Sequence, residues 1–342
     1  MTTRRLPVYL LLDCSESMAG PAIEAVARGV ETLVKELRDN PQAVETAHLS
    51  VITFSREARQ DVPLTELMAF RIPKLRVRPG TALGAALWLL KDRLEREVVK
   101  NAEGIKGDYK PLIFLLTDGQ PTDDWEEAAD AVKQGDGSKF ANVVAIGCGP
   151  DVDIRSLYRI TDSVLLMPDL TAESIRKFFV WLSTSVQAVS VRVDGGGENN
   201  PLNLSALPPD SLEMATPQHD LRGPVEGSPR QVFLHARCSQ TRQPYLMRFV
   251  RREYEERYDA VAAHPLESLD EADAQLLPPI NSSLLLGCPH CPYCEHRHTG
   301  VCPCGALFCA PDNTSPIVCP RCDAQLGSST GRSEFEISRS DG

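Results

Sequence analysis

The feature that most constrains the fold is an alternation of short apolar runs with segments of helical spacing across residues 6–182. Four runs rich in leucine and β-branched residues have the length of strands buried on both faces, at residues 7–12, 48–54, 111–117 and 142–147. Apolar residues three and four apart predict helices over residues 21–38, 81–98, 124–134 and 171–183. This alternation predicts an α/β fold with a doubly wound, mainly parallel sheet.

The rest of the chain has a different character. We expect the α/β domain to occupy residues 1–188, and residues 189–284 to form a proline- and glycine-rich linker with a β-hairpin at 231–237 and 244–250. Residues 285–325 hold most of the cysteines, which predicts a small β-rich module. Residues 326–342 have the composition of a flexible tail.

Charge and hydropathy exclude several classes of partner. The formal net charge of the 342 residues is -11, whereas nucleic acids and anionic membrane surfaces require a basic face. No apolar run approaches the roughly 20 residues that a bilayer span requires. We therefore expect a cytoplasmic protein that binds neither nucleic acid nor membrane.

Oxygen-bearing side chains follow the expected strands at the end where loops of a parallel sheet converge. Asp13, Ser15 and Ser17 alternate directly after the first strand, which places them on one side of an extended segment. Thr81 begins a predicted helix, and Asp118 follows a central strand. Because ligands of open α/β sheets bind beyond the carboxyl ends of the strands, we expect these five side chains to face one point.

This set of ligands suits Mg²⁺ or Mn²⁺, hard cations that prefer oxygen. If the hydroxyl groups of Ser15, Ser17 and Thr81 bind directly and the aspartates act mostly through water, the inner shell carries little negative charge. A carboxylate from another molecule is then the natural last ligand. The expected partner is a protein that supplies an Asp or Glu.

The phrases "LLDCSESMAG" and "LIFLLTDGQPTDDW", with Thr81 between them, resemble the von Willebrand factor A domain. All five positions of that family's metal-ion-dependent adhesion site (MIDAS) match, and the resemblance covers about residues 5–188. With the cysteine-rich end, the chain is similar more narrowly to bacterial TerY-type proteins of tellurium resistance. That resemblance implies a role in tellurite or metal stress alongside a phosphatase and a kinase.

Eight of the 11 cysteines lie between Cys288 and Cys322, a cluster that in a reducing compartment indicates metal rather than disulfides. Two C-x-x-C turns about 25 residues apart supply four thiolates for one Zn²⁺, as in a zinc ribbon. We select Cys291, Cys294, Cys319 and Cys322. Two alternatives stay open: exchange of Cys288 for Cys291, and a second site built from Cys302, Cys304 and Cys309 with His296 or His298.

Other functions fit the sequence less well. A metal-dependent phosphohydrolase using Asp13 as nucleophile would need a carboxylate two residues later, where Ser15 stands. The common hydrolase and nucleotide-binding motifs are absent from the sequence. A nucleic-acid regulator acting through the zinc ribbon would need a basic surface, yet residues 288–323 contain two arginines against three acidic residues.

We therefore expect a non-enzymatic adaptor with Mg²⁺ in the first domain and Zn²⁺ in the last module. We expect Cys14 to be a packing residue, and Asp123 and Asp124 to begin the following helix rather than bind metal.

Overall fold

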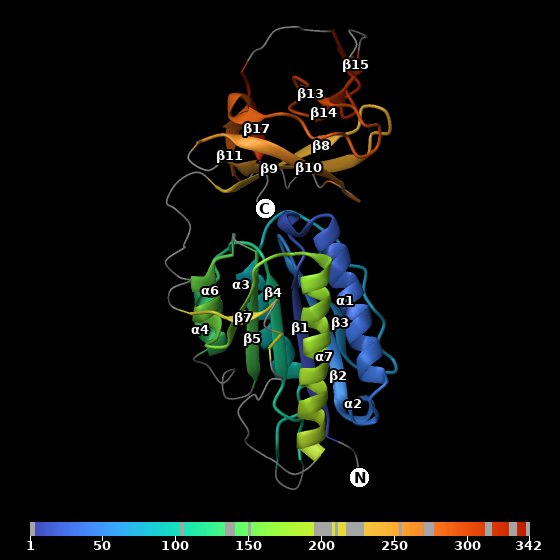
Figure 1. The fold of residues 1–342 in the computed structure, drawn as a ribbon, viewed down its shortest axis with the longest axis vertical. Coiled ribbons are helices and arrows are strands. Elements are labelled where there is room, and N and C mark those ends of the chain that lie inside the picture. The colour runs from blue at the N-terminus through green and yellow to red at the C-terminus, as the bar shows by residue number, and fades with distance from the viewer. Residues whose placement is uncertain are drawn as a thin grey trace. The chain divides into compact units, whose positions relative to one another are not determined.

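The protein consists of two compact units, residues 1–225 and residues 226–342, each of which is described here by itself (Figure 1). The computed structural model describes residues 4–102, 106–133, 141–149, 152–194, 207–208, 211–216, 229–252, 255–267, 269, 277–311, 317–327 and 334–339.

A seven-stranded sheet forms the centre of the first unit, in the order β3-β2-β1-β4-β5-β6-β7. Its strands are β1 (Leu6–Asp13), β2 (Ala47–Phe54), β3 (Ala58–Glu66), β4 (Leu112–Thr117), β5 (Asn142–Cys148), β6 (Val164–Met167) and β7 (Glu213–Met214). The five neighbouring strands β2, β1, β4, β5 and β6 are parallel to one another. The outer strands β3 and β7 run antiparallel to their neighbours. The predicted doubly wound, mainly parallel sheet is confirmed.

Helices cover both faces of this sheet (Figure 1). One face carries α1 (Pro21–Arg38), α2 (Pro41–Thr46) and α7 (Ala172–Asp194). The other face carries α3 (Leu83–Glu97), α4 (Glu126–Lys133) and α6 (Ile154–Ile160). A short 3-10 helix, η1 (Glu16–Met18), lies between β1 and α1.

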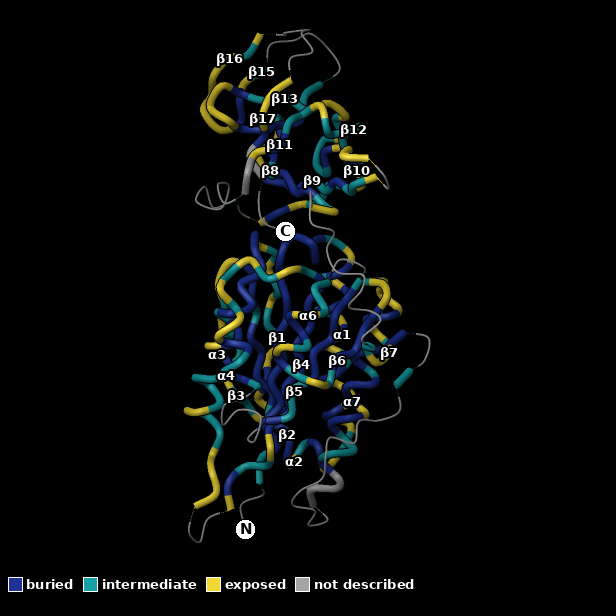
Figure 2. Tube along the Cα trace, turned by 90° about the vertical axis from the view of Figure 1, so that its left-hand side faces the viewer, coloured by how far each residue is buried: buried dark blue, intermediate teal, exposed yellow. Residues whose placement is uncertain are grey.

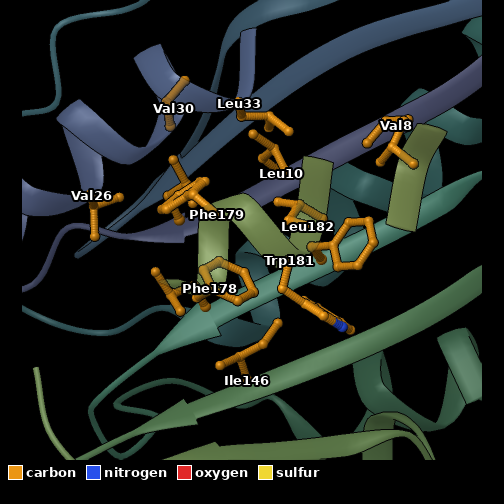
Figure 3. Packing of buried hydrophobic residues seen from close by; sticks show 14 of the residues in the cluster. Val8, Leu10, Val26, Val30, Leu33, Ile146, Phe178, Phe179, Trp181 and Leu182 are labelled. Carbon is orange, nitrogen blue, oxygen red and sulfur yellow. The ribbon is translucent and has the colours of Figure 1, made fainter. Parts of the chain in front are cut away.

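Strand β1 explains why the sheet is buried on both sides. Leu10 and Leu12 join the core beneath α1 and α7, whereas Tyr9 and Leu11 join the core beneath α3 and α4. Figure 3 shows the first of these cores, with Phe178, Phe179 and Trp181 of α7 beside side chains of α1 and β1. The central strands are correspondingly buried along their length (Figure 2).

The first unit extends past the boundary expected at residue 188. Helix α7 continues to Asp194, and β7 pairs with β6 at the edge of the sheet. Leu212 is 3% exposed in the core beneath α1 and α7. The predicted linker therefore contributes a strand and a core residue to this unit, and much of its remainder lies outside the described residues.

The second unit is built on a six-stranded sheet in the order β12-β10-β9-β8-β14-β13. Its strands are β8 (Gln231–Arg237), β9 (Pro244–Arg251), β10 (Tyr258–Pro265), β12 (Leu285–Leu286), β13 (His298–Val301) and β14 (Leu307–Ala310). Two small ladders join β11 (Leu277–Asn281) to β17 (Glu336–Arg339), and β15 (Ile317–Val318) to β16 (Gln325–Leu326). The 3-10 helix η4 (Ser282–Leu284) follows β11.

Two expectations for this half need correction. The predicted hairpin, β8 and β9, is continuous with the cysteine-rich segment, because β14 pairs with β8 in one sheet. The tail expected over residues 326–342 contains β17, whose Ile337 is 5% exposed in the core of this unit. An isolated hairpin is marginally stable, and this shared core supplies the surface that it needs.

Within the described part of the chain, no helix has the length and apolar character needed to cross a membrane.

Candidate metal centres

Three loops are joined to one another by backbone hydrogen bonds at the carboxyl ends of the central strands. Arg78 N donates to Cys14 O at 2.9 Å, which ties the segment before α3 to the loop after β1. Ala82 N donates to Ser55 O at 2.5 Å, and Thr122 N donates to Thr81 O at 3.0 Å. These bonds fix the three loops that carry the predicted ligands.

The structure brings the predicted oxygen side chains together. Ser15 Oγ lies 2.9 Å from Ser17 Oγ, and Ser17 Oγ donates to Asp118 Oδ1 at 2.6 Å. Asp13 Oδ1 accepts a hydrogen bond from Ser15 N at 2.8 Å. A Cβ atom placed on Gly119 would lie 3.2 Å from Thr81 Oγ1 and 3.8 Å from Ser17 Oγ, so Thr81 faces the same loop.

Burial gives this cluster its electrostatic character. Each of the five side chains is at most 6% exposed. Desolvation raises the pKa of Asp13 to about 6, although hydrogen bonds from Ser15 and Thr117 act in the opposite direction. Two carboxylates and three hydroxyl groups held close together form a donor set that suits a small hard cation, and a bound cation would compensate the cost of burying the carboxylates.

Thr117 belongs to the site but was not predicted from the sequence. Its hydroxyl group donates to Asp13 Oδ2 at 2.5 Å and fixes the orientation of that carboxylate. A threonine at the end of an apolar strand is common because β-branched residues favour strands, and only its place directly before Asp118 distinguishes it.

The predicted role of Asp123 needs correction. Helix α4 begins at Glu126, and the carboxylate of Asp123 instead accepts hydrogen bonds from Gly84 N at 3.0 Å and Ala85 N at 2.9 Å. Asp123 thereby caps α3 and connects the loop after β4 to the helix that follows Thr81.

Two buried thiols lie near the same carboxylates. Cys14 is 2% exposed, and burial followed by the charge of Asp13 raises its thiol pKa. Cys148 is fully buried, and its pKa is raised by burial and by the charges of Asp118 and Asp13. A thiol with a raised pKa is a poor nucleophile, which agrees with the packing role expected for Cys14.

Eight of the nine cysteines of the second unit form two groups of four. The first group is Cys238, Cys291, Cys294 and Cys309, and the second is Cys302, Cys304, Cys319 and Cys322. Within each group the sulfur atoms all lie within 4.8 Å of one another. The Cys294–Cys309 and Cys302–Cys322 sulfur distances are 3.4 and 3.6 Å, near the roughly 3.8 Å that tetrahedral zinc with Zn–S of about 2.3 Å requires.

A common turn presents these thiols. Three of the turns begin at Cys238, Cys291 and Cys319. In each turn the backbone N–H of this first cysteine donates to the carbonyl of the residue five positions later. Its carbonyl accepts a hydrogen bond from the N–H of the residue four positions later. This residue four positions after the cysteine has a positive φ in all three turns; it is Arg242, Glu295 or Asp323. The turn at Cys302 is one residue shorter and places Gly305 in the left-handed region.

One thiol of each group has a lowered pKa, whereas the pKa values of Cys291, Cys294, Cys302 and Cys322 are raised. Burial raises the pKa of Cys238, but hydrogen bonds from Thr241 and Gln240 outweigh it and lower the pKa to about 7. Cys319 is likewise lowered to about 7, because bonds from Cys322 and Arg321 overcome its burial. Thiolates are the form that binds metal.

The zinc ligand set selected from sequence is not brought together. Cys291 and Cys294 belong to one group, whereas Cys319 and Cys322 belong to the other. The two C-x-x-C turns therefore belong to separate groups, which Cys238 and Cys309 complete in the first case and Cys302 and Cys304 in the second. Local spacing does not reveal Cys238, which stands about 50 residues upstream at the end of β8.

The remaining candidate ligands stay outside both groups. Cys288 Sγ lies 2.6 Å from Thr299 Oγ1 and does not replace Cys291. Among the described residues, neither His296 nor His298 joins a group of potential metal ligands.

The fold and the loops around Asp13 define a von Willebrand factor type A domain, and residues 8–174 match the model of that family. Residues 229–342 match the TerY-C metal binding domain. The chain is therefore a von Willebrand factor A protein of the TerY type with a C-terminal metal-binding domain.

The chain is similar to solved structures at low sequence identity. Proximal thread matrix protein 1 from the mussel byssus is 18% identical over 54% of this chain and 48% of its own, with a TM-score of 0.40. The ArnB paralog VWA2 from Sulfolobus acidocaldarius is 16% identical over 55% and 45% of the two chains, with a TM-score of 0.39. The chain thus spans about half the length of these proteins. No curated protein matches the sequence.

Proposed function

We propose that this protein is a metal-dependent adaptor that binds a carboxylate of a protein partner at the cluster of Asp13, Ser15, Ser17, Thr81 and Asp118. The observation that carries the proposal is the continuous contact of Ser15, Ser17 and Asp118 at 2.9 and 2.6 Å, beside an Asp13 oriented by Thr117. Von Willebrand factor A domains are typically interaction modules rather than enzymes, which supports the same view.

The residues of the site divide the work. Asp13 and Asp118 supply negative charge, and the hydroxyl groups of Ser15, Ser17 and Thr81 supply neutral donors. A Mg²⁺ or Mn²⁺ ion bound there would offer an open position to an incoming carboxylate. With the hydroxyl groups as direct ligands and the aspartates acting mostly through water, much of the cation's charge would remain for the partner to compensate.

The second unit has a structural role in this proposal. Each four-cysteine group would hold one Zn²⁺, and together the two ions would stabilise the sheet that carries the turns. We place the protein in a reducing compartment such as the cytoplasm, where clustered cysteines bind metal rather than form disulfides. The chain combines the two domains of a TerY-type protein. The candidate partners are therefore a phosphatase and a kinase of a tellurite or metal stress response.

Calorimetric titration of the full chain with Mg²⁺ tests the metal site. We expect one weak binding site in the wild type and its loss in Asp13→Asn and Asp118→Asn, because each change removes a charge while keeping the shape of the side chain. The matched control is Asp124→Asn, which neutralises an exposed aspartate near the site.

The control variant should bind Mg²⁺ like the wild type, and circular dichroism should show that all three variants are folded. Equal Mg²⁺ binding in the wild type and in folded Asp118→Asn would contradict the assignment.

A further inference from the structure

A row of basic side chains leads directly into the metal site. In the segment before Thr81, Lys74, Arg76 and Arg78 are exposed, whereas Leu75 and Val77 between them are half-buried. This alternation is that of an extended chain, in which every second side chain points the same way about 6–7 Å apart. Three cations therefore form a line on the outer side of the segment.

Backbone contacts place this row next to the metal ligands. Arg78 N donates to the carbonyl of Cys14, the residue between Asp13 and Ser15. The backbone N–H of Arg76 lies against the Cys14 thiol. The backbone of the row, at Arg76 and Arg78, is therefore in contact with Cys14 in the loop that carries Asp13 and Ser15.

The turn between β2 and β3 adds to the same side. A Cβ atom on Gly80 would lie 3.2 Å from Arg56 Cα, so the exposed Arg56 stands beside the residue that precedes Thr81. Residues 55–80 contain six basic and three acidic residues, a net charge of +3 in a chain of net charge -11.

Acidic side chains on these segments reduce this charge without reversing it. Glu57 pairs with Arg78 at 3.3 Å, and Asp61 pairs with Arg59 at 2.5 Å. In the loop after β4 and the first turn of α4, Asp124, Glu126 and Glu127 are exposed and acidic. The segment before Thr81 is therefore basic, whereas the segment after Asp118 is acidic.

We propose that Lys74, Arg76 and Arg78 form a docking row for an extended acidic segment of the partner protein, in which further carboxylates at alternate positions follow the one that completes the metal site. This inference rests on the proposed function and adds direction and specificity to it. The acidic segment of the partner would run over residues 74–78 and away from residues 124–127, because the negative charges there would repel it. A peptide with carboxylates two residues apart matches the spacing of the row.

The choice of a peptide carboxylate over nucleic acid follows from the size of the patch. Nucleic-acid binding depends on many phosphate contacts across a broad basic surface. Here the basic row is short, and the exposed side chains of residues 124, 126 and 127 are acidic.

Peptide binding to the full-length protein in Mg²⁺, followed by fluorescence anisotropy, tests the row. The first probe is a labelled peptide in which Asp alternates with Ser. The second has the same length but keeps only its terminal Asp, with Asn at the other acidic positions. We expect the alternating peptide to bind about tenfold more tightly, because three exposed ion pairs each contribute a small factor that salt screens.

The variant that removes the row is Lys74→Gln/Arg76→Gln/Arg78→Gln. It should bind both peptides with the affinity that the wild type shows for the single-Asp peptide. The matched control, Arg28→Gln/Lys35→Gln/Arg96→Gln, removes three exposed charges from α1 and α3. It should retain the tenfold preference.

Each outcome separates the row from the metal site. Equal affinity of the two peptides for the wild type would overturn the row and leave the metal site intact. Binding unaffected by EDTA but lost in the row variant would support the row and contradict the proposed function. Absence of peptide binding by a Mg²⁺-loaded protein, or tighter binding of a DNA oligonucleotide than of the alternating peptide, would also overturn the row.

Discussion

At the residue scale, the proposed metal site includes a hydroxyl group outside the expected ligand set that orients one of its carboxylates. Thr117 donates to Asp13 Oδ2 at 2.5 Å, and Ser15 N donates to Asp13 Oδ1 at 2.8 Å, so both oxygens of this buried carboxylate are oriented. Partners of metal ligands fix their geometry and commonly change metal affinity by about 10–100-fold when removed. Thr117 is therefore a positioning residue of the site.

We expect Thr117→Val to lower Mg²⁺ affinity by roughly tenfold, because valine keeps the shape of threonine but cannot donate to Asp13. Thr117→Ser keeps a hydroxyl group and should stay near wild-type affinity. Calorimetric titration of the two variants measures the difference. Comparable Mg²⁺ affinities for the valine and serine variants would show that the hydroxyl group does not orient the carboxylate.

The same scale shows what the sequence could predict of this site. Asp13, Ser15, Ser17 and Asp118 were predicted from their places after strands and Thr81 from its place at the start of a helix, and the structure brings these side chains together. The cap formed by Asp123 was not predicted, because its partners in α3 stand about 40 residues earlier in the chain. Neighbour relations across loops depend on the assembled sheet rather than on local pattern.

At the element scale, the strands that are apolar on both faces were predictable and the polar or short elements were not. Strand β3 carries Arg59, Asp61 and Pro63 and lies at the edge of the sheet, where one side of the backbone has no partner strand. Proline and charges are tolerated at an edge, but they remove the apolar pattern that indicates a strand. Helix α2 has six residues and β6 has four, which is too short for a periodic signal.

Close packing of α1 against α7 yields a prediction at this scale. A Cβ atom on Gly29 of α1 would lie 2.0 Å from Cδ2 of Phe179, a fully buried ring of α7. Alanine favours helix by about 0.8–1.0 kcal/mol over glycine, but overpacking a core costs about 1–3 kcal/mol. We expect Gly29→Ala to lower the free energy of unfolding by roughly 1 kcal/mol, measured by urea denaturation of the full chain.

A second variant tests the reason for that loss. Phe179→Leu makes room at the contact, so adding Gly29→Ala to it should cost less than adding Gly29→Ala to the wild type. This non-additivity identifies the steric contact as the cause. Strictly additive effects would mean that Gly29 matters for another reason.

At the scale of the whole molecule, the second unit combines segments that are far apart in the sequence. Cys238 follows β8, Cys291 and Cys294 lie in the cysteine-rich segment, and Cys309 lies within β14. The salt bridge between Arg242 and Asp323, at 2.5 Å, connects the turn of one cysteine group with a turn of the other. Spacing in the sequence favoured pairing the two C-x-x-C turns, but the pairing of β14 with β8 brings Cys309 to Cys238 instead.

The two groups predict a definite zinc content. Freshly prepared full-length protein should contain two zinc ions, and Cys238→Ser should contain one, because only the first group loses a ligand. Cys288→Ser is the matched control and should retain both ions, since Cys288 lies in neither group. Elemental analysis of the purified variants measures the ratio of zinc to protein.

The same variants connect metal content to the folding of the unit. Metal-binding free energy in small metal sites is largely folding free energy, so loss of the first ion should increase amide hydrogen exchange in β8 and β14. The sheet of the first unit has a separate core and should keep its protection from exchange. Two zinc ions in Cys238→Ser would remove Cys238 from the site. A single zinc ion in the wild type would instead contradict the two groups and support the single site of Cys291, Cys294, Cys319 and Cys322.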